Sequence, residues 1–173
     1  MKPVVKRYIF CVLIAMLLWA FTTSAQIFEV PDYKIESKED YAKYDDDIIK
    51  ATDWLQQTEW TKEVVIQSNA TKFIFDWIEG SPAVTVSISK PLMDLTDKNP
   101  KLLMTFMSFY VKYSLQHKAE PDNNKANIYA IKALISKYKT EPTHKKDSDV
   151  EKLLKLDAEN KLDAWVTTDF VKS

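Results

Sequence analysis

The chain has almost no glycine, arginine or cysteine: Gly80, Arg7 and Cys11 are the single copies of each among 173 residues. One glycine cannot build the multi-glycine loops that cradle phosphates, or the Gly-x-Ser-x-Gly turn that presents a hydrolase serine. Arginine supplies the bidentate fork that usually clamps phosphates and carboxylates, and none follows residue 7. These absences argue against a nucleotide-dependent enzyme, and we expect no cofactor.

Cysteine is absent after residue 11, which excludes disulfides, thiolate chemistry and cysteine-bound zinc from the rest of the chain. Stability must therefore come from a hydrophobic core. A chain of this length can bury roughly 68 to 70% of its unfolded surface, which is enough for one domain. We expect a single helical domain over residues 37–173.

The first 25 residues have the pattern of a secretory signal peptide. Three basic residues precede an apolar run over residues 8–21, and small residues follow at 23–25. Because the run is shorter than the ~20 residues of a spanning helix, we predict cleavage before Gln26 and no stable membrane insertion afterwards. The predicted location is therefore periplasmic or secreted, and a retained membrane anchor is the alternative.

Charge gives no reason to expect nucleic acid or anionic lipid as a partner. Three of the 24 basic residues lie within residues 1–25, which leaves 21 against 25 acidic residues, a net charge of about −4. Nucleic-acid-binding domains are typically basic.

Hydrophobic periodicity predicts a mostly α-helical protein, a compact bundle of about five helices. Apolar residues recur at intervals of three and four over 37–57, 59–79, 100–118, a stretch ending at 139 and a stretch from 147 or 148 to about 160. Shorter helical pieces are expected at 90–97 and at 162–170. The most apolar helix, 100–118, should lie at the centre of the core, with Asn99 as its N-cap.

Two segments have an extended rather than a helical pattern. Residues 26–36 contain a central proline and no helical period, and form an extended lead-in. Near residues 83–89, Val84, Val86 and Ile88 alternate with small polar residues, which is a strand signal. This segment forms either a two-stranded ribbon with residues 27–30 or an extended stretch lying on the helices. Gly80 just before it should be a left-handed residue ending helix 59–79.

Two stretches around Gly80 carry a resemblance to known proteins. Residues 73–86 (F-I-F-D-W-I-E-G-S-P-A-V-T-V) and 97–107 (D-K-N-P-K-L-L-M-T-F-M) resemble an uncharacterised family of exported bacterial proteins, over residues 73–139. That resemblance implies no activity, ligand or catalytic residue. The order helix, glycine, extended segment, helix is also similar to small periplasmic immunity proteins, helical inhibitors of secreted cell-wall-degrading toxins. Their paired cysteines are missing here.

Histidines and clustered acids are the candidates for chemistry. His117 and His144 are not brought together by their spacing, and His117 at a helix C-terminus has a structural reason. Three aspartates at 45–47 fan out at about 100° per residue, which favours a solvated acidic face over a metal site. Asp76 and Glu79 could pair with other carboxylates as in a glycosidase, but exposed helix-surface acids are expected. We predict no catalytic and no metal site.

These observations favour a non-enzymatic protein-interaction module of the cell envelope, of the inhibitor or immunity type. Its partner would be another protein; no oligomeric state is indicated. Two alternatives stay open: a small-ligand or lipid binder with a cavity between the central helices, and a hydrolase using unrecognised carboxylates or His117. Since aromatic residues are enriched at interfaces, the predicted interaction surface combines Trp60, Trp77, Gly80, Val84 and Val86.

Overall fold

The computed structural model describes residues 27–171, and its regular secondary structure is helical. The α-helices are α2 (Asp45–Gln57), α3 (Val64–Gly80), α4 (Lys90–Asp94), α5 (Lys101–Gln116), α6 (Asn123–Thr140), α7 (Ser148–Ala158) and α8 (Leu162–Trp165). A 3₁₀-helix, η2 (Tyr41–Tyr44), precedes α2, and a π-helical turn, η3 (Val166–Phe170), follows α8. The predicted helical bundle is confirmed, although the described residues hold seven α-helices instead of about five. Within them no strand forms, and no helix is both long and apolar enough to span a bilayer. The predicted signal peptide lies outside the described residues.

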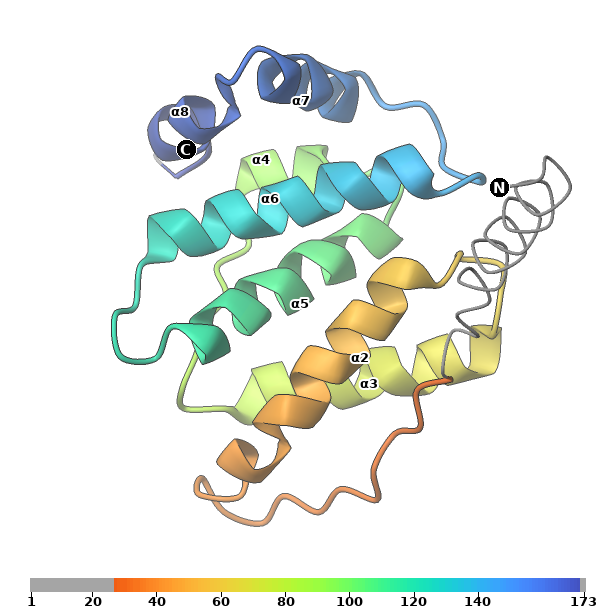
Figure 1. Cartoon of the computed structure of the whole chain (residues 1–173), viewed down its shortest axis with the longest axis vertical. Helices are drawn as coiled ribbons and strands as arrows, with labels where there is room; N and C mark the ends of the chain where they lie inside the picture. The colour runs from red at the N-terminus through yellow and green to blue at the C-terminus, as the bar shows by residue number, and fades with distance from the viewer. Residues whose placement is uncertain (1–26, 172–173) are drawn as a thin grey trace, which may run out of the picture.

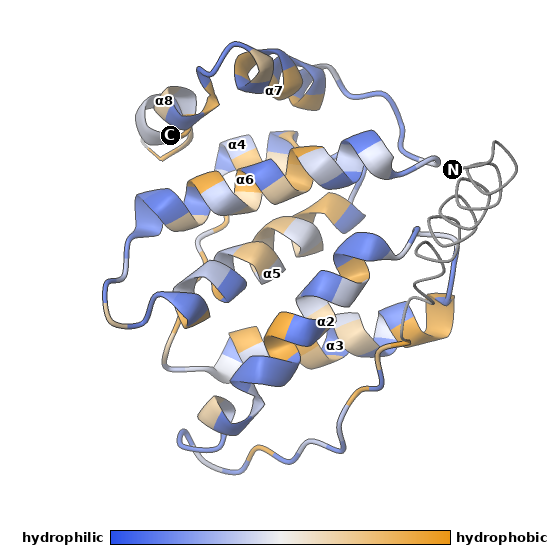
Figure 2. Ribbon diagram, viewed as in Figure 1, coloured by the Kyte–Doolittle hydropathy of each residue, from blue (hydrophilic) through white to orange (hydrophobic). Residues whose placement is uncertain are grey.

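Helix α5 runs through the middle of the molecule, as its apolar sequence predicted (Figure 1). It forms an antiparallel hairpin with α6 on one side and packs against α2 on the other. The core has two clusters. One joins α5 to α4, α6, α7 and the C-terminal turns, and the other joins α5 to α2 and α3. Orange apolar positions accordingly interrupt the blue polar ones along the helices of Figure 2.

Side-chain caps fix the starts of two helices. Asp122 accepts a hydrogen bond from the backbone of Lys125 at the start of α6, and Asp147 caps α7 in the same way. After α7, Asn160 adopts a left-handed conformation with φ of 56°. Asparagine therefore ends this helix where glycine is usual.

The prediction that Asn99 caps α5 is wrong. Its side-chain amide donates to the carbonyl of Lys145 at 2.7 Å, and its oxygen accepts from the backbone N–H of Lys145 at 2.7 Å. Two matched hydrogen bonds to a distant peptide satisfy both ends of a buried amide, whereas a cap would satisfy one. Asn99 thus fastens the α6–α7 loop to the start of α5.

Gly80 does not end α3 in a left-handed conformation, contrary to the prediction, because no glycine in the described residues has positive φ. A Cβ atom at Gly80 would lie 1.7 Å from the hydroxyl oxygen of Tyr41. The Tyr41 ring stands edge-on to Trp77, whose indole N–H donates to the Tyr41 carbonyl at 3.0 Å. A side chain at residue 80 would therefore force the Tyr41 ring to shift from its contact with the end of α3.

Replacing Gly80 by alanine should destabilise the fold by about 1–3 kcal/mol, because the new methyl group displaces the Tyr41 ring. In a Tyr41→Ala background the same substitution should be neutral or stabilising by up to ~1 kcal/mol, since alanine is the better helix former. Urea unfolding of the four proteins in this cycle measures both effects. An equal cost of Gly80→Ala in the two backgrounds would contradict the close-approach explanation.

Candidate functional site

The segment between α3 and α4 is extended and lies on both core clusters. Val84 and Val86 are half-buried and pack against each cluster, while Thr85, Ser87 and Ile88 are exposed. Ile88 is 54% exposed and is one of several large apolar side chains at the surface of the described residues. Of the two arrangements that the sequence left open, the structure has the extended stretch on helices, and residues 27–30 form no ribbon with it.

The backbone of residues 84–88 makes no hydrogen bond to any other described residue. Its two ends are nevertheless held. The Ser81 N–H bonds to the Trp77 carbonyl at the end of α3, and the Met93 N–H bonds to the Ser89 carbonyl at the start of α4. An extended chain with unpaired peptide groups has the properties of an edge strand, a template for pairing with another chain.

The structure separates the residues of the predicted interaction surface. Trp77 is fully buried against η2 and α2, so it cannot contact a partner in this fold. Val84 and Val86 pack against the core, and Gly80 is exposed but has the Tyr41 hydroxyl next to it. Trp60 is half-buried and lies apart from them, beside a pocket.

The exposed residues of the segment were missing from that predicted surface. Within residues 84–88, Thr85, Ser87 and Ile88 are exposed. The period-two pattern could have predicted the exposure of Thr85 and Ser87, because side chains that alternate with the buried valines point to the opposite side. Ile88 breaks the pattern, since it has the parity of Val84 and Val86 but is exposed.

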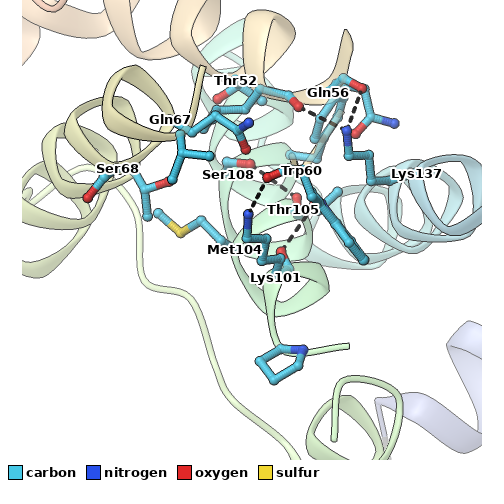
Figure 3. Close-up of a pocket in the computed structure, with 15 residues that line it drawn as sticks. Thr52, Gln56, Trp60, Gln67, Ser68, Lys101, Met104, Thr105, Ser108 and Lys137 are labelled. Atoms are coloured by element: carbon cyan, nitrogen blue, oxygen red, sulfur yellow. Dashed lines mark hydrogen bonds between the residues drawn. The ribbon is translucent and has the colours of Figure 1, made fainter. Parts of the chain in front are cut away.

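A pocket of about 420 Å³ lies between α3 and α5, with α2 contributing to its wall (Figure 3). It forms because α2 packs on both helices while α3 and α5 touch each other little. Its lining includes Leu55 of α2, Val64 and Gln67 of α3, and Lys101, Met104 and Phe109 of α5. The pocket lies between central helices, where the sequence left a ligand-binding cavity open as an alternative, although most of the apolar rows of helix 100–118 are packed in the core and Phe109 is one of the few that line it.

Two buried charged residues lie near one end of this pocket. They are Lys137 on α6 and Glu141, the residue that follows α6. The Lys137 ammonium donates to the carbonyl of Thr58 at 2.6 Å and to those of Leu55 and Gln56 at 3.3 Å. These carbonyls lie at the C-terminal end of α2, where the helix dipole favours a cation. Glu141 lies 3.7 Å from the Lys137 ammonium and accepts a hydrogen bond of 2.8 Å from the backbone N–H of Trp60.

Burial affects the pKa of both Lys137 and Glu141. It lowers the pKa of Lys137, which the nearby Glu141 charge partly opposes. Burial alone would raise the pKa of Glu141, but hydrogen bonds from Thr143 and from the Trp60 backbone hold that pKa below its usual range. Glu141 is therefore ionised at neutral pH, and its role is to fix the turn that carries Trp60.

The same turn explains why α3 begins at Val64 instead of near residue 59. The side-chain amide of Gln67 donates to the carbonyls of Glu59 and Lys62, and Glu63 is left-handed with φ of 45°. Tertiary contacts thus hold residues 58–63 as a turn that helical periodicity could not anticipate. From Val64, α3 continues without a break to Gly80.

The two histidines bond to their own local backbone. Nδ1 of His117 is 2.8 Å from the Tyr113 carbonyl, and the ring stacks on Tyr113 with centroids 4.0 Å apart. Nδ1 of His144 is 2.7 Å from the Glu141 carbonyl. Each has a structural role in this arrangement.

Several aspartates of α2 are held in separate ion pairs. Asp45 pairs with Lys118, Asp47 pairs with Lys50 and Asp53 pairs with Lys112. Within residues 27–171, no group of three or more histidine, cysteine or acidic side chains is arranged to hold a metal ion.

Asp76 is held in its ionised form. Hydrogen bonds from Lys72 and from the Tyr33 hydroxyl, the latter of 2.5 Å, lower the pKa of its carboxyl group. A glycosidase general acid needs the opposite shift. The glycosidase alternative therefore gains no support from Asp76.

Comparison with known proteins yields no match among protein-family profiles, curated proteins or solved structures. The case for a function therefore rests on the residues and geometry of this chain.

Proposed function

We propose that this protein is a non-enzymatic interaction protein of the cell envelope that binds an extended segment of a partner protein alongside residues 84–88. The observation that carries the proposal is the row of unpaired peptide groups between α3 and α4. Proteins commonly bind extended peptides by adding them to such an edge, where the main chain supplies affinity and alternate side chains supply specificity.

The segment is ordered before any partner binds. Val84 and Val86 pack on the core, and hydrogen-bonded helix ends lie on either side. Ordering a flexible loop during association weakens binding, so a backbone already held in the extended form avoids that cost. Ile88 is exposed and offers an apolar side chain that the bound partner segment can contact.

The signal-peptide pattern of residues 1–25 supports placing this interaction in the periplasm or outside the cell. An inhibitor or immunity role would fit an interaction protein in that compartment. The partner that this surface requires is a protein with an exposed strand or a free extended segment, carrying an apolar side chain to meet Ile88.

Proline substitutions test the proposal, because proline removes a backbone N–H from the edge without demanding a different extended conformation. In an extended chain, successive N–H groups point to opposite edges, so Ser87→Pro and Ile88→Pro each disable one edge. We expect one of them to weaken partner binding at least tenfold and Ser87→Thr to change it less than about twofold.

The experiment immobilises the chain lacking residues 1–25, which retains every described residue, and recovers partners from the native envelope extract by cross-linking and mass spectrometry. The recovered protein is then purified and titrated against the three variants. Unchanged affinity in both proline variants would contradict strand pairing at this segment, whatever protein was recovered.

A further inference from the structure

The α2–α3–α5 pocket has an unusual lysine at its rim. Lys101, in the first turn of α5, donates to the carbonyl of Trp60 at 2.9 Å and pairs with no carboxylate in the part of the chain that the structure describes. Other lysines nearby are paired, since Lys112 binds Asp53 and Lys137 lies by Glu141. Lys101 thus brings a positive charge to the rim that no carboxylate of the described residues pairs with directly.

The end of α5 adds to this positive potential. No side chain caps the first turn of this sixteen-residue helix, because Asn99 is bound to Lys145. A helix N-terminus carries a partial positive charge, which adds to the charge of Lys101 on the same turn. Pro100 and Lys101 both line the pocket, so this turn of α5 forms part of its wall.

The rest of the wall is mainly apolar, with a few polar atoms. Leu55, Val64, Met104 and Phe109 provide apolar surface, and Val64 is 58% exposed at the mouth. Gln56 also lines the pocket, and its side-chain oxygen is buried without a hydrogen-bond donor among the described residues. A volume of about 420 Å³ lies within the range of small-molecule sites. Figure 3 shows Lys101 and Met104 close together on α5, with Gln67 and Ser68 across from them on α3.

We infer that this pocket binds a small amphiphilic carboxylate, with its apolar body between α3 and α5 and its carboxylate on the Lys101 ammonium. Charge complementarity selects the anionic head, and the apolar wall selects the body. The site is separate from residues 84–88, so this inference does not depend on the proposed strand pairing.

The probe is decanoate, titrated below its micelle concentration into the chain lacking residues 1–25 and followed by NMR and calorimetry. We expect saturable binding, about fourfold stronger than that of nonanoate because one more methylene is buried. Decyltrimethylammonium, which carries the opposite charge on the same alkyl chain, should bind at least tenfold more weakly.

Variants locate the site. Lys101→Met should weaken decanoate binding at least fivefold, whereas Lys101→Arg, which keeps the charge and a donor for Trp60, should retain it. Ser68 is exposed and lines the pocket, and Asn69 beside it is exposed but does not. Ser68→Trp should therefore block binding, and Asn69→Trp should leave it unchanged.

The inference would be overturned by a lack of saturable decanoate binding, by equal effects of Ser68→Trp and Asn69→Trp, or by equal binding of the cationic probe. The inference would also be overturned if Ser68→Trp abolished binding of a protein partner but left decanoate binding unchanged. The pocket would then belong to the binding site for that partner. Decanoate binding that survives Ser87→Pro and Ile88→Pro would show that the two sites are independent.

Discussion

Replacing Phe106 by alanine is expected to lower the free energy of unfolding by about 3–5 kcal/mol. Phe106 is fully buried in α5, and its ring lies 5.6 Å from that of Phe170 and 6.3 Å from that of Tyr110. The substitution removes a side chain that ties the central helix to the C-terminal turn. Close packing on every side prevents the surroundings from collapsing fully into the space.

Phe75→Ala is the matched control, because Phe75 lies on α3 and is 48% exposed. Its substitution should cost less than about 1 kcal/mol, since little apolar surface returns to water. Urea unfolding of the two variants measures the difference. A cost under about 1 kcal/mol for Phe106→Ala would mean that this face of α5 is not core.

The second large effect is expected from Lys137→Met, at about 3–5 kcal/mol. This substitution removes the hydrogen-bond donor to the Leu55, Gln56 and Thr58 carbonyls and leaves Glu141 buried without its cation. Removing one partner of a buried ion pair is strongly destabilising because the remaining charge is uncompensated.

Lys90→Met provides the control, because the Lys90 side chain is 81% exposed in its ion pair with Asp94 and such pairs contribute about 0–1 kcal/mol. The double variant Lys137→Met/Glu141→Gln should cost less than the sum of its single substitutions, since neither charge is then stranded. Additive costs in urea unfolding would show that the two groups do not act as a pair.

Helical periodicity predicted most of the helices, but it placed the starts of α2 and α3 too early, at residues 37 and 59 instead of Asp45 and Val64, and it did not predict the contacts between helices. The wide apolar face of residues 100–118 identified the central helix, because a helix that is apolar over much of its circumference must be covered on several sides. The alternation around Val84 and Val86 identified the extended segment for a similar local reason. Both signals depend on neighbours in the sequence.

The wrong predictions involve partners far along the chain. Asn99 has the spacing of a cap, but its side chain binds Lys145, 46 residues away. Gly80 has the position of a helix terminator, but its missing side chain makes room for Tyr41. Local sequence patterns do not indicate which distant residue will contact a given side chain. The roles of Asn99 and Gly80 could therefore be recognised only in the tertiary structure.

The candidate sites were predictable only in part. Lys137 and Glu141 have the spacing of an ordinary surface ion pair on a helix, and they are buried because the turn before α3 covers them. The pocket depends on the divergence of α3 from α5, an angle that no sequence pattern encodes. The edge at residues 84–88 could be suspected from its alternation, but its lack of a pairing strand could not.

Hydrogen exchange at the amides of residues 84–88, measured in the free chain and in the complex with its recovered partner, tests the central claim most directly. The account predicts fast exchange in the free chain, because these N–H groups have no hydrogen-bond partner in the described fold. In the complex, exchange at alternate amides should slow at least tenfold as the partner strand pairs with one edge. Equal exchange in the free and bound chain, with protection elsewhere on the surface, would contradict the account.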